Sequence, residues 1–147
     1  GTSENSAASL AKVVKAWKSS ETAATQILTN KELLQQLGAL LVTINSGNAS
    51  LLETSEQLAA LKLQAAAPTS EIAATSQLVM LTQRLAKNAN ELTQGTSINP
   101  EVAFLMGKDV NTFRSTLEKL EASTDPRKPQ SAEMLKKIAT LKNNFSI

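Results

Sequence analysis

The sequence predicts an all-α fold, an elongated antiparallel helical bundle that resembles a four-helix bundle. Over most of the 147 residues apolar positions recur at the i, i+3, i+4, i+7 spacing of a helix face, and no segment alternates as a strand does. Aromatic residues make up only 3% of the chain, so Leu, Ile, Val and Ala must fill a core of closely packed helices. Because a helix of ~25 residues is about 38 Å long, several side by side are expected to form a rod.

The first apolar pattern covers residues 6–28 and the second covers residues 33–44. The junction between them, "LTNKE", leaves two alternatives open. Either Asn30 caps a second helix, or one long helix crosses the junction. Trp17 lies on the apolar face of the first pattern, and we interpret it as core or interface packing rather than a ligand anchor.

The stretch "NSGN", residues 45–48, is predicted to be a turn, because Gly47 can adopt the left-handed conformation that ends a helix. A third helical pattern follows over residues 50–67. Pro68 lacks a backbone donor and disfavours helical geometry in the residue before it, so we expect a break there. A kinked continuous helix is the alternative.

The next helix is expected to run from about Ser70 to Gln94, with Ser70 or Thr69 as its N-terminal cap and Gly95 as its C-terminal cap. The segment "TSINPE" then predicts a strong helix start, with Asn99 as the cap and Pro100 in the first turn.

The helix that begins at Pro100 is predicted to end near Ala122 and to be followed by the loop "STDPRKPQ". Its expected inward residues are Val102, Leu105, Met106, Val110, Phe113, Leu117 and Leu120. A last helix, with Ser131 as a candidate cap, should bury Met134, Leu135, Ile138, Leu141 and Phe145. We expect residues 1–67 to form a first helical part, from a preceding bundle module, and residues 68–147 a second module in one continuous rod.

Composition argues against catalysis and against cofactor or metal binding. The chain has no His and no Cys, which removes the commonest general base, the commonest metal ligands and the thiol nucleophile. The acidic residues are scattered, and the five glycines form no phosphate-binding loop. The net charge is +2 without a basic stripe, which argues against nucleic-acid binding. No apolar run reaches transmembrane length, and the start at Gly1 without Met indicates a fragment of a longer protein.

The candidate site lies in the stretch "QLVMLTQRLAKNAN", residues 77–90, where four donor-bearing side chains cluster: Gln83, Arg84, Lys87 and Asn88. Arg84 borders the apolar stripe of this helix, which leaves two interpretations. Its methylenes can lie on the stripe while the guanidinium pairs with a carboxylate of a neighbouring helix. Alternatively, its donors point into a groove and bind an anionic or carbonyl group.

The segment "MLTQRLAKNANEL", Met80 to Leu92, resembles the signature helix of PilJ-type sensory domains, which reads approximately Met-Leu-Ser/Thr-Gln-Arg-hydrophobic-Ala-Lys. The segment "GTSINPEVAFLMGKDVNTFRSTLEKL" that follows also resembles this family, so that the similarity covers roughly Ser70 to Leu120. The resemblance implies a periplasmic signal-input domain of an inner-membrane methyl-accepting chemoreceptor, controlling type IV pilus twitching motility and surface sensing. It further implies membrane attachment through transmembrane helices outside this fragment, a homodimeric full-length receptor and the pilin subunit as input.

One position departs from related nitrate-sensing bundles, in which the arginine just before the Met binds the anion. Val79 stands at that position here, and a valine cannot donate to an oxyanion. The departure favours a protein input, which predicts an exposed apolar or mixed patch. Two alternatives stay open. A small-molecule chemoeffector sensor predicts a cavity lined by Arg84, Asn88 or Gln83, and a structural spacer or dimerisation module predicts well-packed seams throughout.

Overall fold

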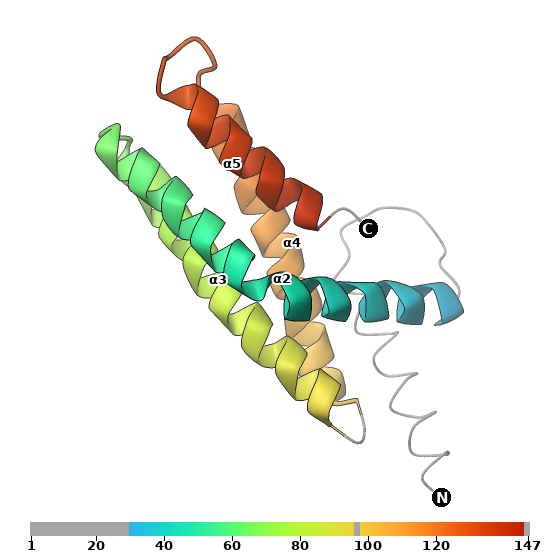
Figure 1. Cartoon of the computed structure of the whole chain (residues 1–147). Helices are drawn as coiled ribbons and strands as arrows, with labels where there is room; N and C mark the ends of the chain where they lie inside the picture. The colour runs from blue at the N-terminus through green and yellow to red at the C-terminus, as the bar shows by residue number, and fades with distance from the viewer. Residues whose placement is uncertain (1–29, 96–97, 146–147) are drawn as a thin grey trace, which may run out of the picture.

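The computed structural model describes residues 30–95 and 98–145, with side chains from Gln35 onward. Four helices make up this part of the chain (Figure 1): α2 (Asn30–Gln64), α3 (Thr69–Gln94), α4 (Pro100–Ser123) and α5 (Ser131–Asn144). Helix α2 packs against α3 and α5, and α4 packs against the same two helices, whereas the backbones of the two diagonal pairs stay apart. This ring of successively antiparallel helices confirms the predicted all-α bundle over the described residues.

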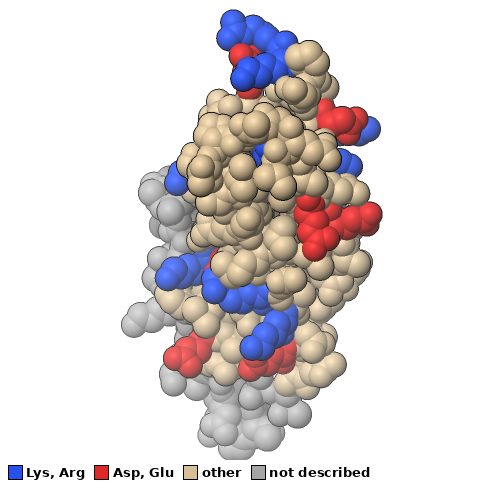
Figure 2. All heavy atoms as spheres, turned by 90° about the vertical axis from the view of Figure 1, so that its left-hand side faces the viewer, with Lys and Arg blue, Asp and Glu red and all other residues tan. Residues whose placement is uncertain are grey.

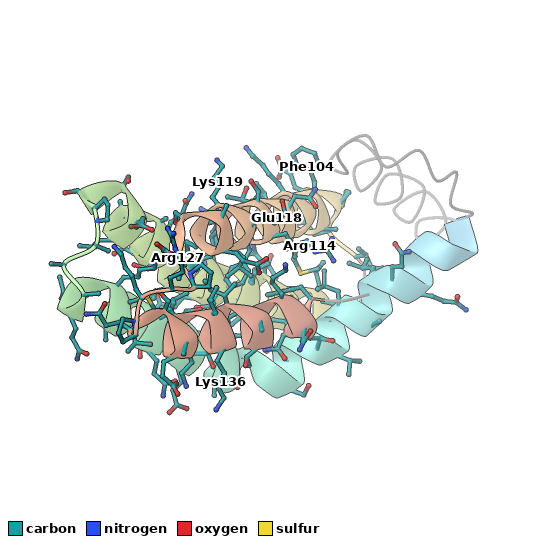
Figure 3. The ribbon with its side chains drawn as sticks, turned by 90° about the horizontal axis from the view of Figure 1, so that it is seen from above. Phe104, Arg114, Glu118, Lys119, Arg127 and Lys136 are labelled. Carbon is teal, nitrogen blue, oxygen red and sulfur yellow. The ribbon has the colours of Figure 1, made fainter. Side chains whose placement is uncertain are left out.

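The core is a column of aliphatic side chains from all four helices, closed by two aromatic rings. Phe113 of α4 and Phe145 after α5 are both buried, and their ring centroids are 4.8 Å apart. Figure 3 shows Arg114 on the side of α4 that faces α5, where its guanidinium donates to the Phe145 carbonyl oxygen at 2.6 Å. The end of α5 is therefore attached to α4 by both apolar and polar contacts.

Helix α2 continues through the "NSGN" stretch, so the predicted turn at residues 45–48 is wrong. The buried residues Leu37, Ile44, Leu51 and Leu58 follow one another at intervals of seven, and this repeat passes through the stretch without a change of register. A turn at residues 45–48 would have pointed the buried residues on one side of it away from the core. Figure 1 shows instead that α2 bends in its teal section, and a Ser-Gly pair is a common cause of such bends.

The predicted break at Pro68 is confirmed, and it is a tight turn between α2 and α3. The N–H groups of Ala66 and Ala67 donate to the carbonyl oxygens of Leu63 and Lys62, both at 3.0 Å. This is the hydrogen-bond pattern of a Schellman motif, and Ala66 takes its left-handed position with φ 52°. Neither Thr69 nor Ser70 caps α3, because Pro68 occupies the cap position and makes no side-chain bond.

Three further predictions concern the ends of the other helices. Helix α3 ends before Gly95 as expected, although Gly95 is extended, with φ −72°, rather than left-handed. Asn99 caps α4 as predicted, since its side-chain oxygen accepts from the Glu101 N–H at 3.0 Å. The predicted cap Ser131 is instead the first residue of α5, and Gln130 holds the cap position without a side-chain bond.

One predicted core residue of α4 is wrong. Leu105 is 45% exposed, whereas its neighbour Met106 is fully buried. Successive residues of a helix are about 100° apart, so the stripe centred on Met106, Val110 and Phe113 leaves Leu105 on the flank. The other six predicted positions are buried. In α5, Leu135 is only partly buried.

The predicted division between residues 1–67 and 68–147 falls in the turn between α2 and α3. The second part of α2 packs along α3, and this is the most extensive helix contact of the bundle. Over the described residues, the two predicted parts therefore share one core. The first predicted helix, with Trp17, lies outside these residues. Among the described helices, none is long and apolar enough to cross a membrane.

Candidate functional site

Arg84 forms a two-point ion pair with Asp109, which joins α3 to α4. Arg84 Nε and one terminal nitrogen donate to the two Asp109 carboxylate oxygens, each at 2.6 Å. The Arg84 side chain is 49% exposed, whereas that of Asp109 is 3% exposed. The hydrogen bond to Asp109 raises the pKa of Arg84 above its ordinary value. Of the two interpretations, the structure shows the first, an arginine paired with a carboxylate of a neighbouring helix.

The other three predicted site residues do not converge with Arg84. Gln83 is exposed and lines a shallow groove of about 310 Å³ between α2 and α3, beside Asn48 and Leu52. Lys87 is exposed, and Asn88 is 8% exposed. Neither Arg84 nor Asn88 lines that groove. The four side chains therefore form no shared pocket, and a recognition role for any of them stays a prediction.

A second polar cluster lies at the end of the bundle where the α2–α3 turn meets the loop after α4. Lys62 of α2 is only 3% exposed. Its ammonium donates to Glu71 Oε1 of α3 at 3.1 Å and to Thr124 Oγ1 at 2.8 Å, at the C-terminal end of α4. The Thr124 hydroxyl in turn donates to the Leu120 carbonyl oxygen at 2.6 Å. One buried amine therefore links three helices, and we call Lys62, Glu71 and Thr124 the end cluster.

The end cluster favours an ionised Glu71. Burial raises the pKa of Glu71, but the hydrogen bonds from Ser123 and Lys62 and the charges of Lys62 and Lys128 outweigh it. The pKa of Glu71 therefore lies below its ordinary value, so that the carboxylate balances the charge of Lys62 at neutral pH. Together they form a largely buried ion pair whose ammonium uses two of its three donors, one to Glu71 and one to Thr124.

A cavity of about 120 Å³ borders the end cluster, between the α2–α3 turn and the start of α5. Its polar lining includes Lys62, Glu71, Lys128 and Ser131, and its apolar lining includes Met134 and the alanines before Pro68. Figure 2 shows blue and red atoms gathered at this end of the molecule, at the top of the view. The cavity is therefore small, partly apolar and bordered by charge.

The position of Lys62 in the sequence is a signal for the end cluster. Lys62 follows Leu51 and Leu58 by eleven and four residues, so it lies on the buried stripe of α2. A lysine on such a stripe requires a partner in the folded protein. Glu71 comes nine residues later, across the turn. The predicted site at residues 77–90 instead consisted of donors on a helix surface, where most side chains are solvated.

The described residues contain no group of three or more acidic side chains that could hold a metal ion. Comparison with protein-family models, with curated proteins and with solved structures finds no match to this chain.

Proposed function

We propose that this chain is the signal-input domain of a PilJ-type methyl-accepting chemoreceptor, with the type IV pilin subunit as its input. The proposal rests on the signature-like segment Met80 to Leu92, and the fold supports it. That segment lies in α3, which packs against both α2 and α4. A helix between two partners is suited to passing a displacement from one side of a bundle to the other.

The observation that carries the protein input is an uncharged outer face of α3. No charged residue occurs between Glu71 and Arg84. The exposed residues of this stretch that recur at helical spacing are Ala73, Ser76, Gln77, Met80 and Gln83. Figure 2, which faces the side of α2 and α3, shows a broad area with almost no blue or red atoms below the charged atoms at its top. Depletion of charge around an exposed methionine is typical of a protein contact surface. We call these five residues the α3 face.

The proposed mechanism uses the two polar connections of α3. The end cluster joins α3 to α2 and α4 at one end, and the Arg84–Asp109 pair joins it to α4 nearer the middle. A partner on the α3 face would favour one packing of α3 over another, and both connections would pass that shift to α4. In the full receptor, this domain would lie in the periplasm and work as a homodimer.

Binding of purified type IV pilin to the immobilised chain, measured by biolayer interferometry, tests this proposal. Met80→Lys places a charge in the α3 face, and we expect it to weaken binding at least about tenfold, as loss of a central interface residue does. Phe104→Lys is the matched control, since Phe104 is 36% exposed and projects from the outer side of α4 (Figure 3). Absence of pilin binding, or equal weakening by the two variants, would overturn the proposal.

A further inference from the structure

We propose that the cavity beside the end cluster binds a short-chain monocarboxylate. This site lies apart from the α3 face, and the inference does not depend on the proposed receptor function. The argument rests on four features of the cavity: its unused donors, its neutralised carboxylates, its apolar lining and its volume.

Three side chains that line the cavity have hydrogen-bond donors without a partner in the part of the molecule that the structure describes. Lys62 Nζ carries three N–H groups, and its bonds to Glu71 and Thr124 use two. Ser131 is 4% exposed, and its hydroxyl has no hydrogen-bond partner among the described residues. Lys128 belongs to no ion pair within the described part of the chain. A buried hydroxyl and two ammonium groups without full partners fit an anionic acceptor.

The carboxylates that line the cavity are already paired and do not exclude an anion. Glu71 accepts from Lys62 at 3.1 Å, and Asp125 accepts from Arg127 at 3.0 and 3.1 Å. Within the lining, the positive charges of Lys62 and Lys128 balance the negative charges of Glu71 and Asp125. Arg127, outside the lining, pairs with Asp125 and offsets its charge. Gln130, at the start of α5, makes no side-chain cap bond, and a helix N-terminus favours a nearby negative charge.

The remainder of the lining favours a ligand whose carboxylate carries a short apolar tail. Ala67, Pro68 and Met134 contribute apolar surface to the cavity. The cavity, at about 120 Å³, is small, so a short guest fits it better than a bulky one. Propionate fits these features, because its carboxylate can accept from Ser131 and the lysines while its ethyl group contacts Met134.

Titration of the ¹⁵N-labelled chain with sodium propionate, at ionic strength held constant with NaCl, tests the proposal by NMR. We expect saturable shifts of the Ala67, Ser131 and Met134 amides. Ser131→Ala should raise the Kd about tenfold, the effect of one hydrogen bond to a charged group. The fold should be retained because Ser131 caps no helix.

Lys128→Ala and Lys136→Ala provide a matched pair of variants that remove the same charge. Lys128 lines the cavity, whereas Lys136 projects outward from α5 (Figure 3). We expect only Lys128→Ala to weaken propionate binding. Three outcomes would each overturn the proposal: shifts that NaCl alone reproduces, shifts without saturation, and a Kd unchanged by both Ser131→Ala and Lys128→Ala.

Discussion

Two interhelical ion pairs hold α3 in the bundle, and they differ in what happens when one partner is lost. In the end cluster, Lys62 is buried and Glu71 is partly buried, with 3% and 13% of their side chains exposed. In the Arg84–Asp109 pair, only the aspartate is buried, and the arginine is 49% exposed. A charge left alone in the end cluster faces only the small cavity beside it, whereas Arg84 can turn into bulk solvent. The depth of each group, rather than the length of its bond, determines the cost of breaking a pair.

The largest expected effect is that of Glu71→Leu, because it leaves the Lys62 ammonium buried beside an apolar side chain. We expect a loss of about 3 kcal/mol in the free energy of unfolding, measured by urea denaturation. Glu91→Leu is the control, since Glu91 is an exposed carboxylate of the same helix. Its effect should stay within about 0.5 kcal/mol. Equal losses for the two variants would show that Lys62 is solvated.

The Arg84–Asp109 pair should respond asymmetrically to removal of its partners. Arg84→Ala leaves a nearly buried carboxylate without a donor, and we expect a loss of about 2 kcal/mol. Asp109→Ala leaves an arginine that can turn into solvent, and the expected loss is about 1 kcal/mol. Denaturation of both single variants and of the double variant measures the coupling between them. A larger loss for Asp109→Ala would contradict the assignment of Asp109 as the buried partner.

Acidification should weaken the end cluster. The pKa of Glu71 is lowered in the folded protein, so its ionisation stabilises the fold above the unfolded value near 4.5. That contribution is lost as the pH falls below 4.5 through the folded pKa. Glu71→Gln removes this titration, and its stability should therefore decline less steeply with acid than that of the parent chain. Parallel slopes between pH 5 and pH 3 would contradict the lowered pKa.

Gly47→Ala distinguishes a helix from a turn in the middle of α2. Nothing lies within 4 Å of a Cβ added at Gly47 or at Gly38, so neither substitution meets a clash. In a helix, each should raise the stability by about 1 kcal/mol, because alanine has the higher helix propensity. Thermal unfolding of the two variants measures this. If Gly47→Ala destabilises the chain while Gly38→Ala stabilises it, residues 45–48 form the turn that the sequence alone predicted.

The smallest expected effect is that of Ala66→Gly, beside the end cluster. Ala66 has a φ of 52°, which costs an L-residue about 1–2 kcal/mol, and glycine removes this cost. The greater freedom of glycine in the unfolded chain offsets part of the gain, which leaves about 0.5 kcal/mol. Ala60→Gly, inside α2, should instead destabilise by about 1 kcal/mol. A loss of stability for Ala66→Gly would show that the turn does not use this conformation in solution.

Local signals predicted the helices, the Asn99 cap and the break at Pro68, because each depends on residues close together in the chain. The prediction of a turn at residues 45–48 was wrong. Gly47 is compatible with two conformations, and the buried repeat of α2 selects the helical one. Similarly, the sequence singled out Arg84 but left two interpretations open, pairing with a carboxylate of a neighbouring helix or binding of an anionic or carbonyl group. The choice of Asp109, 25 residues away, depends on how α3 and α4 are aligned.

The sequence by itself determined the all-α class and most of the apolar stripes, because helical periodicity is a property of neighbouring residues. Only the tertiary structure decided which polar residues are buried together. Lys62 and Glu71 belong to α2 and α3, and Thr124 directly follows α4. The sequence placed Lys62 on a buried stripe, but it did not show that Glu71 and Thr124 would both meet it at one end of the bundle. The buried ion pair and its adjacent cavity arise where helix ends meet, which is determined by the packing of the whole bundle.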